Sequence, residues 1–230
     1  CKRDRSAETP AGQLPAEPIR DPQEVEKILL PEAVANAEAA NFKAESEIFQ
    51  KELKVRISGF GGQGILSLGL NIANMGRLRN FNVSWMPSYG PEMRGGTANV
   101  CVILSDRKIS SPIVTKYDTA IILNQQSLDK FESAVKPGGL LIYDPNGIIR
   151  HPERTDITVC RINAVDVAAK VGNSKVYNMA VLGGYLKMKP VVEMENVEKG
   201  LQKSIPARYS DLIALNKAAI EEGMKSVEIL

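Results

Sequence analysis

Residues 58–78, "SGFGGQGILSLGLNIANMGRL", join a glycine-rich turn to an apolar run with the periodicity of a helix. The preceding residues 54–58, "KVRIS", predict a strand that leads into the turn. Gly59, Gly61 and Gly64 have the G-x-G-x-x-G spacing at this strand-to-helix junction. Glycines let the backbone approach a phosphate, and the start of the following helix offers unpaired N–H groups. The turn therefore binds a dinucleotide or another phosphate ligand, or it is a tight connection without a ligand.

Apolar segments alternate with helical patterns along residues 54–230, which is typical of an α/β domain. Strands that are apolar throughout indicate a parallel sheet covered on both faces. We therefore expect a three-layer, Rossmann-like α/β fold with a mostly parallel sheet and helices on both faces. The predicted strands are 54–60, 81–86, 97–104, 119–124, 138–144 and 156–162, and the predicted helices are 65–78, 127–135, 163–171, 178–188 and 209–227.

Residues 1–53 differ from the rest in composition and are predicted to form an N-terminal extension. Four prolines fall within residues 1–22, where apolar side chains are few. Residues 32–53 favour a helix, but its apolar face is thin and it would need a partner surface. We expect a helical and extended arm that lies on its own domain or wraps around another subunit.

The composition restricts the classes of function. A formal net charge of +2 gives no argument for nucleic acid or a membrane surface as a partner. No run of about 18 apolar residues exists to span a bilayer. A single histidine, His151, excludes a multi-histidine metal site within this chain and is expected at the surface. Three separated cysteines, without a C-x-x-C pair, cannot alone ligate an iron–sulfur cluster or zinc, and they suit a reducing cytoplasm. Cys101 and Cys160 fall in predicted strands and are expected to be inert core thiols.

The acidic residue that an NAD site requires is missing from its expected place. An Asp or Glu about 20 residues beyond the glycines, after the second strand, binds the ribose hydroxyls in such sites. No Asp or Glu occurs between Leu53 and Pro91. The missing acid argues against an NAD site, but a site for another anion or phosphate stays possible. An NADP site would need an arginine near the 2′-phosphate, and no arginine directly follows residues 83–86.

A second unusual stretch, "SWMPSYGPEMRGGTANV" at residues 84–100, follows the second predicted strand. It should therefore lie at the carboxyl edge of the sheet, beside the glycine turn. Its prolines and glycines stiffen and shape a loop that exposes Tyr89, Glu92, Met93 and Arg94. Exposed aromatic, methionine and arginine side chains suit a binding or interface surface. The alternative is a long connection that only covers the edge of the sheet.

These motifs together resemble the gamma subunit of the 2-oxoacid:ferredoxin oxidoreductases, over about residues 54–225. The resemblance rests on "GFGGQGI" at 59–65, "SYGPEMRGGTANV" at 88–100, "SDRKISSPIV" at 105–114 and "NMAVLGGYLK" at 178–187. It is greater to the 2-oxoglutarate and branched-chain members than to the pyruvate members. Residues 1–50 depart from the family pattern.

The resemblance implies an enzyme complex in which a 2-oxoacid, coenzyme A and oxidised ferredoxin give acyl-CoA, carbon dioxide and reduced ferredoxin. Thiamine diphosphate and Mg²⁺ would belong to the alpha and beta subunits, and iron–sulfur clusters to the beta or ferredoxin-like parts. This chain alone would bind no cofactor, would carry no catalytic residue and would be inactive, with coenzyme A as a shared substrate. Its tasks would be to support the assembly and to help receive coenzyme A.

The resemblance also implies which residues form the site. The phosphates or pantetheine of coenzyme A would approach the glycine turn, and Arg94 would contact an anion or a partner carboxylate. Two other classes stay open, namely a free-standing NAD(P)-binding Rossmann oxidoreductase and a non-catalytic scaffold subunit. Asn124 lines the same crevice or is structural, and Asn178 could cap the following helix. The candidate binding residues are Gly59, Phe60, Gly61, Gly62, Gln63, Gly64 and Asn124, and those at the interface or active-site entrance are Ser88, Tyr89, Glu92, Met93 and Arg94.

Overall fold

The computed structural model of this chain describes residues 52–90, 96–191, 194–204 and 211–230. The chain divides into two compact units, Cys1–Ile48 and Phe49–Leu230, and every described residue belongs to the second. The predicted arm over residues 1–53 therefore lies almost entirely outside the described residues. The domain boundary at residue 54 stays a prediction.

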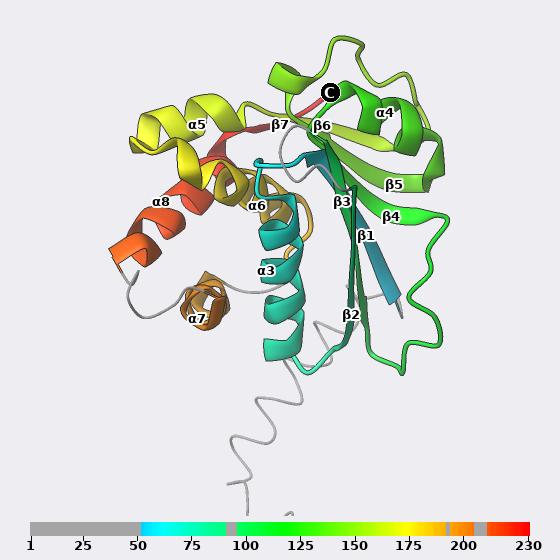
Figure 1. Cartoon of the computed structure of the whole chain (residues 1–230), viewed down its shortest axis with the longest axis horizontal. Coiled ribbons are helices and arrows are strands. Elements are labelled where there is room, and N and C mark those ends of the chain that lie inside the picture. Colours follow the sequence, from blue (N-terminus) through cyan, green and yellow to red (C-terminus); the bar gives the residue numbers. More distant parts are fainter. Residues whose placement is uncertain (1–51, 91–95, 192–193, 205–210) are drawn as a thin grey trace, which may run out of the picture. The chain divides into compact units, whose positions relative to one another are not determined.

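Within the described residues, seven strands form one mixed sheet, in the order β2-β3-β1-β4-β5-β6-β7 (Figure 1). The pairs β1–β4, β4–β5 and β5–β6 are parallel, whereas β3 is antiparallel to both β1 and β2, and β7 is antiparallel to β6. The α/β fold is as predicted, and β2 runs in the same direction as the parallel strands. The strands are β1 (Glu52–Phe60), β2 (Asn82–Tyr89), β3 (Thr97–Ser105), β4 (Tyr117–Ile122), β5 (Val135–Tyr143), β6 (Thr158–Ile162) and β7 (Val227–Ile229).

The hairpin of β2 and β3 is the main departure from a uniformly parallel sheet. Residues 90–96 alone connect these strands, and a parallel crossover needs a dozen or more residues. The two strands therefore pair with each other, and β3 lies between β1 and β2.

Helices cover both faces of the sheet, but unequally (Figure 1). One face packs against five helices and holds the larger core, which includes Val55 and Ile57 of β1. The other face packs against α4 through Leu128 and Phe131. None of the described helices is long and apolar enough to cross a membrane. The helices on the larger core are α3 (Ile65–Leu78), α5 (Ala164–Val171), α6 (Tyr177–Met188), α7 (Met194–Ser204) and α8 (Asp211–Ser226); the others are α4 (Gln125–Phe131) and the 3-10 turns η1 (Glu132–Ala134), η2 (Pro145–Gly147) and η3 (Ser174–Val176).

Helix α6 is the central helix of the larger core. Its residues from Met179 to Leu186 are buried without interruption, so it is surrounded by protein rather than amphipathic. Helix α8 packs directly on it, because a Cβ on Gly183 would lie 2.1 Å from the carbonyl oxygen of Ile220. In the same way, a Cβ on Gly223 would lie 2.1 Å from the carbonyl oxygen of Ala180. The two glycines therefore set the distance between α6 and α8.

We expect Gly223→Ala to lower the free energy of unfolding by about 1–3 kcal/mol, since the new methyl group must displace backbone rather than a flexible side chain. Gly90→Ala is the matched control, because a Cβ on Gly90 meets no atom within 4 Å among the residues that the structure describes. Urea denaturation of both variants measures the difference. Equal stability of the two variants would show that α6 and α8 are not in this close contact.

Candidate functional site

The glycine turn owes its shape to two residues in the left-handed region of backbone conformation. Gly62 has φ +102° and Gly64 has φ +73°, and residues other than glycine rarely adopt such values. A Cβ on Gly64 would also lie 2.7 Å from Nδ2 of Asn178, whereas a Cβ on Gly62 would meet no atom of the described residues within 4 Å. As far as these residues show, the turn is closed against α6 at Gly64 and open at Gly62.

Gln63 fixes the turn to the sheet. Its Oε1 accepts a hydrogen bond from the N–H of Phe60 at 2.6 Å, and its Nε2 donates to the carbonyl oxygen of Leu123 at 3.2 Å. The side chain fills the space beside Gly59, where a Cβ would lie 2.4 Å from Oε1 of Gln63. Gln63 thus joins the end of β1 to the end of β4.

Asn124 and Asn178 both have structural contacts at this edge of the sheet. Asn124 is fully buried, and its Oδ1 caps α4 by accepting from the N–H of Ser127 at 2.9 Å. The sequence suggested that Asn178 caps α6, but this is wrong. The helix begins one residue earlier, at Tyr177, and its N-cap is Val176. Instead, Nδ2 of Asn178 donates to the carbonyl oxygen of Gly64 at 3.4 Å.

The two sequence motifs meet at the carboxyl end of β1. The N–H of Gly61 donates to the carbonyl oxygen of Gly96 at 2.8 Å, and Phe60 pairs with Thr97. The last residue of the hairpin connection, Gly96, therefore lies beside the glycine turn. Ser88 and Tyr89 are exposed at the end of β2, with Tyr89 58% accessible. The candidate residues Glu92, Met93 and Arg94 lie outside the described residues.

The start of α3 has the electrostatic character of an anion site. The first N–H groups of a helix lack intrahelical acceptors and carry a partial positive charge. The first turn of α3 contains no acidic residue, and its N-cap, Gly64, makes no side-chain capping bond. An anion that enters over Gly62 would meet these N–H groups.

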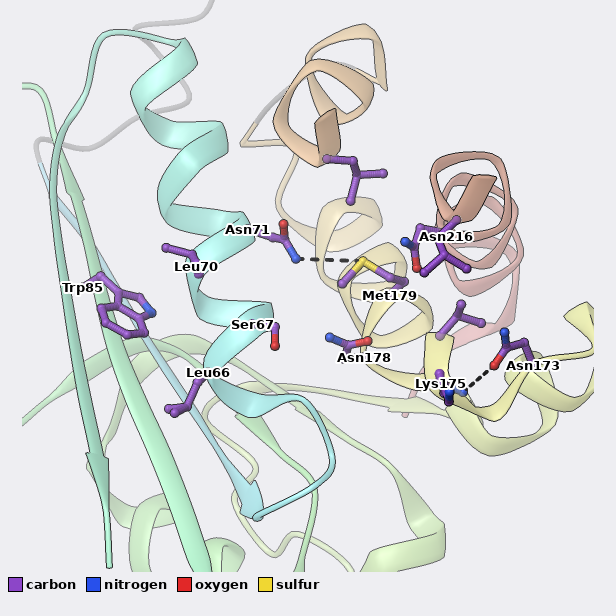
Figure 2. Close-up of a pocket in the computed structure, with 13 residues that line it drawn as sticks. Leu66, Ser67, Leu70, Asn71, Trp85, Asn173, Lys175, Asn178, Met179 and Asn216 are labelled. Carbon is purple, nitrogen blue, oxygen red and sulfur yellow. Dashed lines mark hydrogen bonds between the residues drawn. The ribbon is translucent and has the colours of Figure 1, made fainter. Parts of the chain in front are cut away.

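A groove of about 470 Å³ opens beside the turn, between α3, α6, α7 and α8, with Trp85 of β2 at its rim (Figure 2). No pattern in the sequence predicted this groove. Its walls are mostly apolar, while Ser67, Asn71, Asn178 and Asn216 supply uncharged polar groups. One feature of the sequence could have indicated the groove: Asn71 is a polar residue within an apolar helical pattern, and it occupies a buried position of α3. The apolar wall residues include Leu66, Leu70, Val176, Met179, Leu201 and Leu212.

The cysteines and the histidine are placed as predicted. Cys101 and Cys160 are buried and free. Burial raises the pKa of both thiols, that of Cys160 to about 11, so neither forms a thiolate near neutral pH. His151 is exposed, and its Nδ1 lies 3.3 Å from the hydroxyl oxygen of Tyr143.

The end of β2 bears on the NAD alternative. The acid that binds a ribose stands about 20 residues beyond the glycines, after the strand that follows the first helix, which here is β2, and no Asp or Glu occurs between Leu53 and Pro91. Asn124, which follows the neighbouring parallel strand β4, is buried as a helix cap. Asp144 follows β5 and is fully buried, and its Oδ1 accepts from the N–H of Asn146 at 2.8 Å. The pKa of Tyr177 is raised, mainly because the residue is buried and to a lesser extent because Asp144 is nearby.

The family model for pyruvate ferredoxin/flavodoxin oxidoreductase matches residues 54–226 of this chain. The chain belongs to this family. Among family members, 2-oxoglutarate synthase subunit KorC of Methanocaldococcus jannaschii is 33% identical over 170 residues, which cover 71% of this chain and 90% of KorC. Ketoisovalerate oxidoreductase subunit VorA of Methanothermobacter marburgensis is 37% identical over 133 residues, which cover 58% of this chain but only 28% of VorA.

A solved structure of the family has the same fold. The keto/oxoacid ferredoxin oxidoreductase gamma subunit from Geobacter sulfurreducens has a TM-score of 0.66 and 26% identity. The similarity covers 78% of this chain and 100% of that subunit. The resemblance to a gamma subunit that the sequence motifs indicated is therefore confirmed at the level of the family and the fold.

We expect Gly64→Ala to lower stability more than Gly62→Ala. Both variants carry backbone strain of about 1–3 kcal/mol, but only the former also pushes against Asn178. Adding Asn178→Ala to Gly64→Ala should remove most of the difference. Chemical denaturation of the three variants measures this coupling, and a Gly64→Ala variant as stable as Gly62→Ala would contradict the contact with α6.

We expect the free energy of unfolding to fall as the pH rises above the ordinary thiol pKa of about 8.5. The unfolded chain then loses the Cys160 proton, while the folded chain keeps it until the pH passes about 11. Cys160→Ala should weaken this pH dependence between about pH 8 and pH 10.5, measured by urea denaturation. An identical dependence in both proteins would show that the buried thiol is not linked to folding.

Proposed function

We propose that this chain is the gamma-type part of a thiamine-dependent 2-oxoacid:ferredoxin oxidoreductase of the cytoplasm. It would support the oxidative decarboxylation of a 2-oxoacid to acyl-CoA, with reduction of ferredoxin. Membership of the family supports this proposal, as does the likeness to a subunit named gamma. The names of the relatives favour 2-oxoglutarate or a branched-chain 2-oxoacid as the substrate.

The partner subunits would hold the cofactors. Iron–sulfur clusters require several thiolate ligands in one place. Cys101 and Cys160 do not fit this need, because they belong to cores on opposite faces of the sheet and both thiols are buried. Thiamine diphosphate, Mg²⁺ and the clusters therefore belong to alpha, beta and ferredoxin-like parts in this proposal, and the isolated chain has no turnover.

The glycine turn would receive a phosphate or the pantetheine of coenzyme A. The observation that supports this step is the hydrogen bond from the N–H of Gly61 to the carbonyl oxygen of Gly96, which joins the end of the hairpin connection to the turn. The start of α3 would attract the phosphates, and Gly62 leaves room for them. The chain's own contribution is to bind and orient coenzyme A; the bond-making steps would take place in the partners.

Arg94 would act from the same connection. Its guanidinium could pair with a coenzyme A phosphate or with a carboxylate of a partner subunit, and Ser88, Tyr89, Glu92 and Met93 would face the partners. The alternative of a free-standing NAD(P) oxidoreductase is less well supported, because no Asp or Glu occurs between Leu53 and Pro91, where the ribose-binding acid would stand.

We test the coenzyme A contact with Gly62→Asp, using Gly62→Asn as the matched control. Both residues have the same size and tolerate a positive φ, so they differ in charge alone. In the complex assembled by co-expression with alpha and beta subunits, Asp should repel the phosphates and raise the KM for coenzyme A at least about fivefold relative to Asn, with a similar kcat.

Equal KM values for the two variants would show that the turn does not contact coenzyme A and would favour a scaffold role. Reduction of viologen by the isolated chain with a 2-oxoacid would contradict the assignment as a gamma part.

A further inference from the structure

The groove beside the glycine turn presents a row of side-chain amides. Asn71 of α3, Asn178 of α6 and Asn216 of α8 point toward it from three helices (Figure 2). An asparagine side chain carries one acceptor oxygen and one donor amide, which is the same set as a peptide group. Several asparagines along one groove can therefore bind a polypeptide main chain whatever its sequence.

Asn71 is the strongest sign that something binds there. Only 5% of it is accessible, and its Oδ1 has no hydrogen-bond partner among the described residues. Its Nδ2 faces the sulfur of Met179 at 4.0 Å, and a thioether is a weak acceptor. A buried amide oxygen without a partner is costly. This oxygen is closed to solvent, so a ligand N–H in the groove would bond to it after the Asn71 side chain turns toward the groove.

The walls and the charge of the groove define the rest of the ligand. Leu70, Trp85 and Leu212 expose 41%, 36% and 40% of their surface at the groove, which is unusual for large apolar side chains gathered in one place. Among the described residues, those that line the groove include no acid, and Lys175 forms no ion pair. Apolar side chains and one carboxylate are the complementary features.

We propose that this groove binds an extended peptide segment of a partner protein that carries apolar side chains and a carboxylate. Asn71, Asn178 and Asn216 bind its main chain, the apolar walls hold its side chains, and Lys175 pairs with the carboxylate. A small compact anion fits less well, since the polar groups are uncharged amides carried by three helices rather than cations around one point. This binding surface is separate from the coenzyme A contact proposed at Gly62.

The test uses the full 230-residue chain and displayed random peptides of about seven residues with free C-termini. Enriched peptides are synthesised and their affinity is measured by fluorescence polarisation. We expect apolar sequences with a carboxylate, whose affinity falls at least about tenfold with Asn71→Leu and with N-methylation of one main-chain amide. Lys175→Met should weaken the acidic peptides and leave their amide analogues unaffected.

Two controls separate binding from folding. Asn82→Leu places the same substitution on the exposed start of β2 and should not change peptide affinity. Asn71→Leu should also raise the melting temperature, because it removes an unpartnered polar group from the core. Asn216→Ala, at a half-buried position of α8, gives a second reading of affinity if Asn71→Leu does not fold.

Three results would overturn the proposal. These are a selection without enriched peptides, an affinity that the Asn71→Leu and Asn216→Ala variants leave unchanged, and a folded Asn71→Leu protein with a lower melting temperature than the wild type.

Discussion

The length of the connection between β2 and β3 constrains the whole candidate site. Residues 90–96 cannot carry a parallel crossover, so β3 returns antiparallel and inserts beside β1. Its first residues then pair with the last residues of β1, and the N–H of Gly61 reaches the carbonyl oxygen of Gly96. The glycine turn and the end of the β2–β3 connection, which are separated in the sequence by α3 and β2, thereby meet at the carboxyl end of β1.

Helix α6 connects this surface to the core. Its second residue, Asn178, bonds to the glycine turn, and the next, Met179, faces Asn71 across the groove. Further along, Gly183 allows the close approach of α8, which contributes Asn216 to the same groove. The turn and the groove are therefore fixed by the same buried helix, and a change in its packing would alter both.

Local patterns allowed much of this structure to be predicted from the sequence. The glycine spacing predicted the strand, turn and helix around residue 60, and Gly96, at the end of the loop after β2, does lie beside this turn. Two elements were missed, α7 and β7: the former has a polar average composition, and the latter is a three-residue strand at the end of a helical pattern. The direction of β3 was also missed, because strand patterns carry no information on pairing.

The site was less predictable than the fold for a physical reason. Gln63 was assigned to ligand binding from its place in the motif, but its amide bonds to Phe60 and Leu123, which are contacts that need the folded sheet. The groove depends on four helices, and no single segment of the sequence encodes it.

We propose that coenzyme A binds across the glycine turn and the hairpin connection together. Hydrogen–deuterium exchange of the assembled complex, with and without coenzyme A, tests this binding mode most directly. We expect peptides covering residues 60–68 and 88–97 to become protected together when coenzyme A is added. Protection of neither segment, or of one without the other, would contradict it.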